Sequence, residues 1–93
     1  MKKIMVQFNI PGMTLKQVDQ AWDALRASGY AHPKGLVHHT NAAHGNNILI
    51  VDVWESQQDW DNFGPVLGPI LGKLGVADTQ PLIVPVHSDY LGK

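Results

Sequence analysis

Residues 47–63, NILIVDVWESQQDWDNF, decide the fold, because they join a strand pattern directly to a capped helix pattern. Side chains of a strand alternate between the two faces of a sheet. One face would carry Ile48, Ile50, Asp52 and Trp54, and the other Leu49, Val51 and Val53. The second set is aliphatic, whereas the first adds a carboxylate and an indole N–H, which need partners when buried. We therefore expect function on the face that carries Asp52 and Trp54.

Three further strand patterns and one further helix pattern surround this stretch. Alternation predicts strands at residues 3–10, 36–42 and 81–87. Thr14 and Gln17 form a predicted capping box, and Gly29 fits the end of the helix that Thr14 caps. An apolar stripe on this helix comprises Leu15, Val18, Trp22 and Leu25, and we expect Trp22 and Trp60 to lie in the core.

The helix that Ser56 caps contains two Gly-Pro pairs, at residues 64–65 and 68–69. Proline removes a backbone donor and clashes with the preceding turn. We therefore expect a break or kink near residues 64–65, followed by a second helical piece that ends near Leu74.

The β-α-β-β-α-β order predicts one ferredoxin-like α+β domain over residues 1–93, with a four-stranded antiparallel sheet and both helices on one face. We expect the helices to cover the side of Ile4, Val6 and Phe8 together with the aliphatic side of residues 47–54. The opposite, mixed face would then carry Met5, Gln7, Asn9, Ile48, Ile50, Asp52 and Trp54. Such a face is too apolar to lie in water, so we expect a second copy to cover it in a homodimer.

Composition excludes several classes of function. The chain has no cysteine, which excludes thiolate chemistry. Its net charge is −1 and only 16% of its residues are charged, so nucleic-acid binding is not expected. No apolar run approaches the roughly 20 residues of a membrane span. We expect a cytoplasmic protein that does not bind membranes.

The hairpin between the second and third strands predicts which histidine joins Asp52. A two-residue turn, which suits Gly45-Asn46 and which we favour, would place His39 on the face of Asp52 and Trp54 and His38 on the other. A loop with an odd number of residues would exchange the two histidines. In the last strand, His87 would also lie on the mixed face. The predicted site is therefore His39 and Asp52 as catalytic residues, with Gln7, Asn9, Trp54 and His87 as ligand-binding residues.

Three interpretations of this cluster stay open from the residues alone. Asp52 could orient His39 as a general base, the cluster could line a ligand pocket without chemistry, or it could be a polar network that only specifies the dimer. The histidine spacing matches no metal motif, so we expect no metal site. The sequence contains no phosphate-binding loop and no nucleophile motif, and we expect no cofactor. If the protein is an enzyme, proton transfer or cofactor-free oxygen chemistry fits these residues better than hydrolysis.

The chain resembles the dimeric α+β-barrel superfamily, which includes antibiotic-biosynthesis-monooxygenase-like and stress-responsive barrel proteins, and it is particularly similar to short bacterial members. The resemblance rests on residues 10–14 (IPGMT), 35–39 (GLVHH) and 51–56 (VDVWES), and on residues 60–63, Leu67, Pro69 and residues 85–87. It implies a homodimer with a pocket for flat aromatic molecules, to which Asn9 and Trp54 contribute. Haem-degrading relatives use a histidine of the second helix, which is missing from residues 57–74.

Together these patterns predict a small dimeric barrel protein that binds a small apolar or aromatic molecule near Trp54. Whether it is an enzyme stays open. One alternative is a cofactor-independent monooxygenase or cyclase of secondary metabolism. The other is a non-catalytic interaction protein whose polar cluster specifies the dimer.

Overall fold

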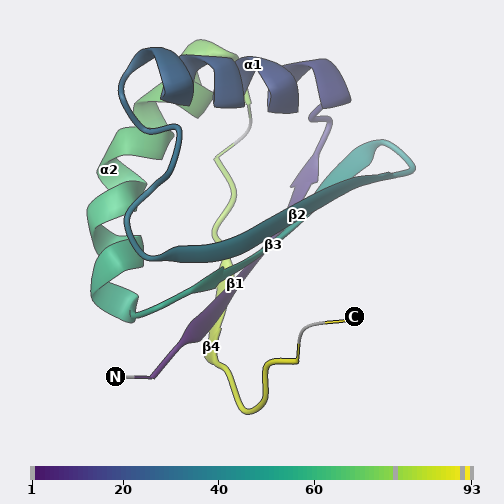
Figure 1. The fold of residues 1–93 in the computed structure, drawn as a ribbon. Coiled ribbons are helices and arrows are strands. Elements are labelled where there is room, and N and C mark those ends of the chain that lie inside the picture. Colours follow the sequence, from purple (N-terminus) through teal and green to yellow (C-terminus); the bar gives the residue numbers. More distant parts are fainter. Residues whose placement is uncertain (1, 77, 91, 93) are drawn as a thin grey trace.

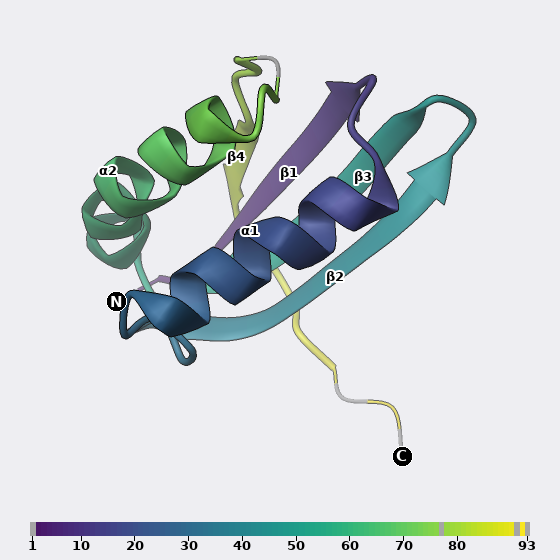
Figure 2. The ribbon, with the colours of Figure 1, turned by 90° about the horizontal axis from the view of Figure 1, so that it is seen from above.

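The computed structural model describes residues 2–76, 78–90 and 92. The elements are, in chain order, β1 (Ile4–Pro11), α1 (Leu15–Ala27), β2 (Leu36–His44), β3 (Asn47–Trp54), α2 (Gln57–Lys73) and β4 (Leu82–Pro85). The strands form one antiparallel sheet in the order β2-β3-β1-β4, and both helices lie on one side of it (Figures 1 and 2). The predicted ferredoxin-like α+β fold is confirmed.

The register between β1 and β3 corrects our assignment of the sheet faces. Val6 pairs with Asp52 and Ile4 with Trp54, so these residues share a face. That face packs against the helices, and the aliphatic side of β3 (Leu49, Val51 and Val53) lies on the outer face instead. The prediction that the helices cover Leu49, Val51 and Val53, leaving Asp52 and Trp54 for a partner sheet, is therefore wrong.

α1 begins and ends as the sequence predicts. The Thr14 hydroxyl accepts from the Gln17 backbone N–H at 3.1 Å, and the Gln17 side chain accepts from the Thr14 N–H at 2.9 Å. At the other end Gly29 has a φ of +89°, and the Tyr30 N–H bonds back to the Leu25 carbonyl at 2.7 Å. This αL residue reverses the chain toward β2.

α2 is one continuous helix from Gln57 to Lys73 that includes Pro65 and Pro69, so the expected break into two helical pieces is wrong, while the kink stays a prediction. Both prolines are exposed. The two carbonyls that lose their helical partners, those of Asp61 and Pro65, also belong to exposed residues, so water can satisfy them. The helix therefore continues through both prolines.

The core lies between the sheet and the two helices. Trp54, Val6, Leu25, Ile48 and Ile10 are its most buried large side chains. Of the predicted stripe on α1, Val18 and Leu25 are buried, whereas Leu15 is 54% exposed. Burial of this apolar surface against one sheet face is the main term that holds the fold together.

The outer face of the sheet carries apolar side chains and no helix. Val51, Val84 and Met5 are half-buried there, and Leu82 is 58% exposed. The C-terminal segment runs on this side, opposite the helices (Figure 1). Its Asp89 carboxylate lies 3.4 Å from the Lys3 ammonium and 4.0 Å from His38 Nε2.

No helix among the described residues is long and apolar enough to cross a lipid bilayer.

Candidate functional site

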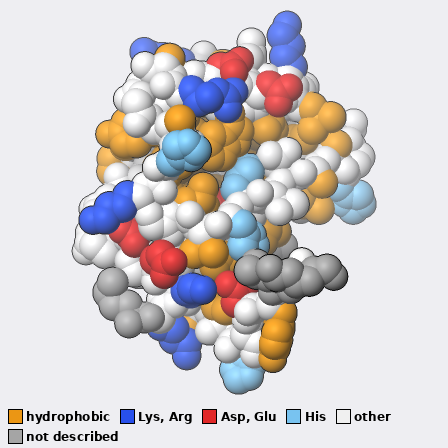
Figure 3. Space-filling model, in the orientation of Figure 1, with side chains coloured by type: hydrophobic (Ala, Val, Ile, Leu, Met, Phe, Trp, Pro, Cys, Tyr) orange, Lys and Arg blue, Asp and Glu red, His pale blue; other side chains and the backbone are white. Residues whose placement is uncertain are grey.

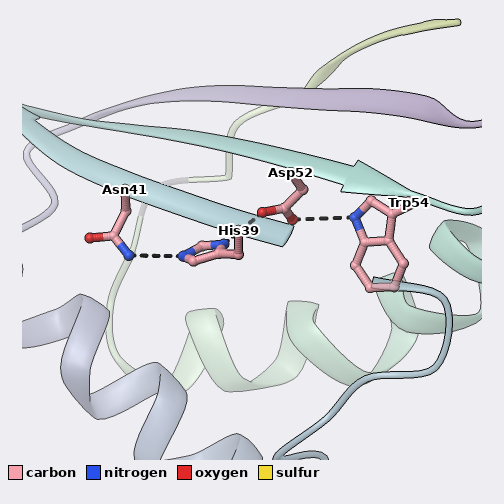
Figure 4. Close-up of polar contacts among 4 residues, drawn as sticks. All are labelled: His39, Asn41, Asp52 and Trp54. Carbon is pink, nitrogen blue, oxygen red and sulfur yellow. Dashed lines mark hydrogen bonds and ion pairs between the residues drawn. The ribbon is translucent and has the colours of Figure 1, made fainter. Parts of the chain in front are cut away.

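Four side chains of β2 and β3 form one line of hydrogen bonds between the sheet and the helices (Figure 4). His39 Nδ1 lies 2.6 Å from Asp52 Oδ1, and the Trp54 indole N–H donates to Asp52 Oδ2 at 3.3 Å. The other ring nitrogen, His39 Nε2, lies 2.8 Å from Asn41 Nδ2. We call these four residues, Asn41, His39, Asp52 and Trp54, the polar line.

The hairpin register explains this arrangement. His44 pairs with Asn47 across a two-residue turn, in which Gly45 has a φ of +59°. From that turn the pairing runs back to place His39 directly opposite Asp52. The predicted orientation of His39 is therefore confirmed. Asn41 follows His39 by two residues, so it projects from the same face.

Asp52 fixes the hydrogen positions along the polar line. An ionised carboxylate only accepts hydrogen bonds, so His39 Nδ1 must donate to it. In a neutral ring Nε2 then carries a lone pair, which accepts from the Asn41 amide N–H. Both oxygens of Asp52 are thus satisfied, one by His39 and one by Trp54.

Burial makes these contacts strong. The side chains of His39 and Asp52 are 17% and 9% exposed, and Trp54 is 0% exposed. Electrostatic attraction is larger where water is excluded. Among the described residues, no buried side-chain nitrogen or oxygen is left without a partner.

A small apolar cavity lies beside the polar line, between the sheet and the helices. Its volume is about 50 Å³, and His39, Asp52 and Trp54 line it together with Trp22 and Leu71. Further lining residues, all apolar, come from β1, β2, β3, both helices and the segment between β1 and α1: Phe8, Ile10, Met13, Val18, Ala21, Leu25, Leu36, Ile50, Phe63 and Leu67. In the space-filling view, histidine and hydrophobic side chains meet in a hollow between helices and sheet (Figure 3).

Aromatic rings hold the polar line from two sides. The Trp22 ring meets His39 edge-on, with centroids 5.0 Å apart. Trp54 packs against Phe63 and Trp60 of α2, at 5.0 and 5.7 Å between centroids. Trp60 is core, as predicted, whereas Trp22 is only half-buried and belongs to the site.

A second, larger hollow adjoins the small cavity. This groove has a volume of about 520 Å³ and runs along the face of α2 that carries Gly64, Gly68 and Gly72. Phe8, Ile10, Leu67 and Leu71 line both hollows. These shared side chains are therefore the partition between the cavity and the groove.

Three predicted ligand-binding residues lie away from the polar line. Gln7 and Asn9 project from the outer face, so the prediction that they share a face with Asp52 is wrong. Asn9 instead accepts from the Asn47 amide at 2.9 Å. His87 is exposed and follows the end of β4, which is shorter than predicted. Trp54 does adjoin the cavity, as a fully buried side chain in its wall.

The remaining histidines do not join the site. His38 lies on the outer face, next to Asp89, and His44 is exposed at the hairpin. Within the described part of the chain, no three potential ligand side chains come together in a way that could hold a metal ion.

Sequence reasoning missed two site residues, Asn41 and Trp22. Asn41 had a readable signal, because a residue two positions from His39 on one strand shares its face. Trp22 had none beyond its place on the apolar stripe of α1, since its contact with His39 depends on how α1 crosses β2.

No protein-family model and no curated protein matches the sequence. Solved structures match the fold over nearly the whole chain. A dimeric ferredoxin-like protein from an uncultured marine organism has a TM-score of 0.68 at 12% identity, and covers 100% of this chain and 95% of its own.

Two matching structures are oxygenases from Streptomyces. SnoaB from Streptomyces nogalater, a cofactor-independent oxygenase, has a TM-score of 0.67 at 14% identity, with 96% of this chain and 97% of its own covered. The monooxygenase from the gene ActVA-Orf6 of Streptomyces coelicolor, in complex with nanaomycin D, has a TM-score of 0.65 at 14% identity, with 99% and 93% covered. The chain therefore has the fold of dimeric ferredoxin-like and antibiotic-biosynthesis-monooxygenase-like proteins.

Proposed function

We propose that this protein binds a small, flat, apolar molecule between its sheet and helices, and that His39 acts there as a general base oriented by Asp52. The observation that carries the proposal is the 2.6 Å contact between His39 Nδ1 and Asp52 Oδ1 at the wall of an apolar cavity. Asp52 holds the ring in one tautomer and stabilises the imidazolium that forms when Nε2 takes a proton.

The size of the cavity limits how a ligand enters. An apolar cavity of about 150 Å³ holds benzene, so the 50 Å³ beside His39 cannot hold an aromatic ring without movement. Leu67 and Leu71 separate this space from the groove of about 520 Å³. A change of rotamer in these two side chains would join the two hollows into one pocket of the size that small molecules use.

The fold of the matching oxygenases supports cofactor-independent oxygen chemistry as the enzymatic version of this proposal. A general base that removes a proton from an acidic substrate leaves a carbanion or phenolate that can react with oxygen. The chain's own contribution would be binding, exclusion of water and proton transfer to Nε2.

We also propose that two copies associate through the outer face of the sheet. Val51, Val84 and Leu82 give that face an apolar surface that no helix covers, and a ferredoxin-like protein with a matching fold is dimeric. A second copy is the simplest cover. The polar line faces the helices, so it cannot specify a dimer that forms through the outer face. The alternative of a non-catalytic interaction protein, which depended on a polar cluster at the dimer interface, therefore loses its main argument. The cytoplasmic location stays a prediction.

Proton transfer is tested with 2-tetralone, an apolar aromatic ketone whose hydrogens beside the carbonyl are acidic. In deuterated water, proton NMR follows their replacement by deuterium. We expect the protein to accelerate this exchange, and His39→Ala to reduce the acceleration by about a hundredfold or more. His38→Ala is the matched control and should leave it unchanged, because His38 lies on the outer face. Equal rates with both variants would exclude His39 as the base.

Binding is tested separately with naphthalene and ¹⁵N-labelled protein. We expect shifts at the side-chain N–H groups of Trp22 and Trp54, and tighter binding in Leu71→Ala, which opens the partition. Shifts confined to exposed residues such as Tyr30 would place the ligand elsewhere.

The dimer is tested by light scattering. Leu82→Lys should favour the monomer, whereas Leu15→Lys should not, because Leu15 is similarly exposed but lies on α1.

A further inference from the structure

The amide of Asn41 covers the one nitrogen of His39 that a ligand would need. Asp52 occupies Nδ1 at 2.6 Å, and Asn41 Nδ2 occupies Nε2 at 2.8 Å. A ligand can therefore reach the basic nitrogen only by displacing Asn41.

The two contacts of His39 differ in strength. The contact with Asp52 joins the ring to an ion, and such hydrogen bonds are roughly twice as strong as neutral ones. The contact with Asn41 joins two neutral groups. Asn41 also lies on the edge strand β2 and is half-buried, whereas Asp52 is buried. Asn41 is thus the partner that gives way.

We propose that Asn41 is a ligand-binding and positioning residue that selects aromatic molecules with a hydroxyl group. The hydroxyl would donate to Nε2 in place of Asn41, and the displaced amide N–H would donate to the same oxygen. The 2.8 Å spacing of the two nitrogens allows one oxygen to lie within hydrogen-bond distance of both. This inference rests on the proposed function, because Asn41 contacts His39, and His39 lines the cavity where the ligand would bind.

Proton transfer in this arrangement is balanced. The O–H bond of the ligand breaks as an N–H bond forms at Nε2, and the electron pair stays on the oxygen. The imidazolium is paired with Asp52, and the phenolate accepts from Nε2–H and from the Asn41 amide. Donors already aimed at a developing negative charge stabilise it without reorganisation.

An amide suits this position better than other small side chains. Alanine provides no donor. A carboxylate would repel the phenolate, and in the free protein it could only accept, so it would require a hydrogen on Nε2.

The first test does not need a ligand. In ¹⁵N NMR of the free protein at neutral pH, we expect His39 to carry hydrogen on Nδ1 only and Nε2 to be a bare acceptor. Asn41→Asp should place a hydrogen on Nε2, whereas Asn41→Ala should leave Nε2 bare. A hydrogen on Nε2 of the wild-type ring would overturn the proposal, because the Asn41 amide would then have to accept.

The second test compares 2-naphthol with 2-methoxynaphthalene, which differ in the hydroxyl hydrogen. We expect the wild-type protein to bind 2-naphthol several-fold more tightly. Asn41→Ala should weaken the binding of 2-naphthol by about two- to tenfold. The same substitution should change the affinity for 2-methoxynaphthalene less. Asn9→Ala, which removes a strand asparagine from the outer face, should change neither.

Equal affinities of the wild-type protein for the two probes would overturn the selection of hydroxyl groups, and so would equal losses of affinity for both probes in Asn41→Ala. Either result would leave the proposed pocket supported. Binding of neither probe, nor of naphthalene, would overturn the proposed pocket and this inference with it. The nitrogen shifts would still report which tautomer the free protein adopts.

Discussion

His39 and Asp52 are cross-strand neighbours whose side chains meet at 2.6 Å on the face of the sheet that the helices cover. Because both are largely buried, each is the main partner that satisfies the other. Removing one leaves a polar group in an apolar surrounding, which costs more than the net gain of the bond itself.

A double-mutant cycle should therefore show strong coupling between these two residues. We expect a coupling free energy of about 1–3 kcal/mol between His39→Ala and Asp52→Asn, measured by urea unfolding. The control pair, His38→Ala with Asp52→Asn, should be additive because His38 projects from the opposite face. Coupling that is equally small in both cycles would contradict a buried hydrogen-bonded pair.

Two leucines of α1 should differ sharply in their contribution to stability. Leu25 is 1% exposed and Leu15 is 54% exposed. We expect Leu25→Ala to lower the free energy of unfolding by about 2–5 kcal/mol, because it leaves a cavity. Leu15→Ala should change it by no more than about 0.5 kcal/mol. Similar losses for both would mean that Leu15 is covered in solution.

Gly35 should not tolerate a side chain. Its φ is +86°, and an added Cβ would overlap the Asp59 carboxylate, which Ser56 holds by a 3.0 Å hydrogen bond. We expect Gly35→Ala to cost about 2–4 kcal/mol in thermal or urea unfolding, from the αL conformation and the overlap together.

The control for Gly35 is Gly29→Ala, where φ is +89° and nothing lies within 4 Å of the added Cβ. Gly29→Ala should lower the free energy of unfolding by about 1–2 kcal/mol, which is the contribution of the αL conformation alone. Combining Gly35→Ala with Asp59→Gly, which removes the Asp59 Cβ as well as the carboxylate, should reduce its cost, measured against Asp59→Gly alone, to the same value. If the cost stays high, the overlap with Asp59 is not its cause.

Gly68 should be replaceable with a gain in stability. It lies inside α2, has ordinary helical φ, and an added Cβ would meet nothing within 4 Å. We expect Gly68→Ala to raise the free energy of unfolding by about 0.5–1 kcal/mol, because glycine loses more backbone entropy in a helix. A loss of stability would show that the groove along α2 is filled in solution.

The turns and caps were predictable because they depend on residues close together in the chain. Thr14, Gln17 and Gly29 delimit α1, and Gly45-Asn46 sets the hairpin that places His39 opposite Asp52. The α2 break was predicted from the prolines alone. It fails because Phe63 before Pro65 and Leu67 and Ile70 after it all pack in or against the core, while both prolines face solvent.

The sequence by itself determined the order of elements and the fold, and its Gly45-Asn46 turn favoured the hairpin register in which His39 meets Asp52. Only the tertiary structure decided which face of β3 the helices cover. β1 and β3 are not joined by a turn, so no local geometry fixes their register, and both faces of β3 are apolar enough to form a core. Packing placed Val6 opposite Asp52, which put the polar line beneath the helices and left Val51 on the outer face.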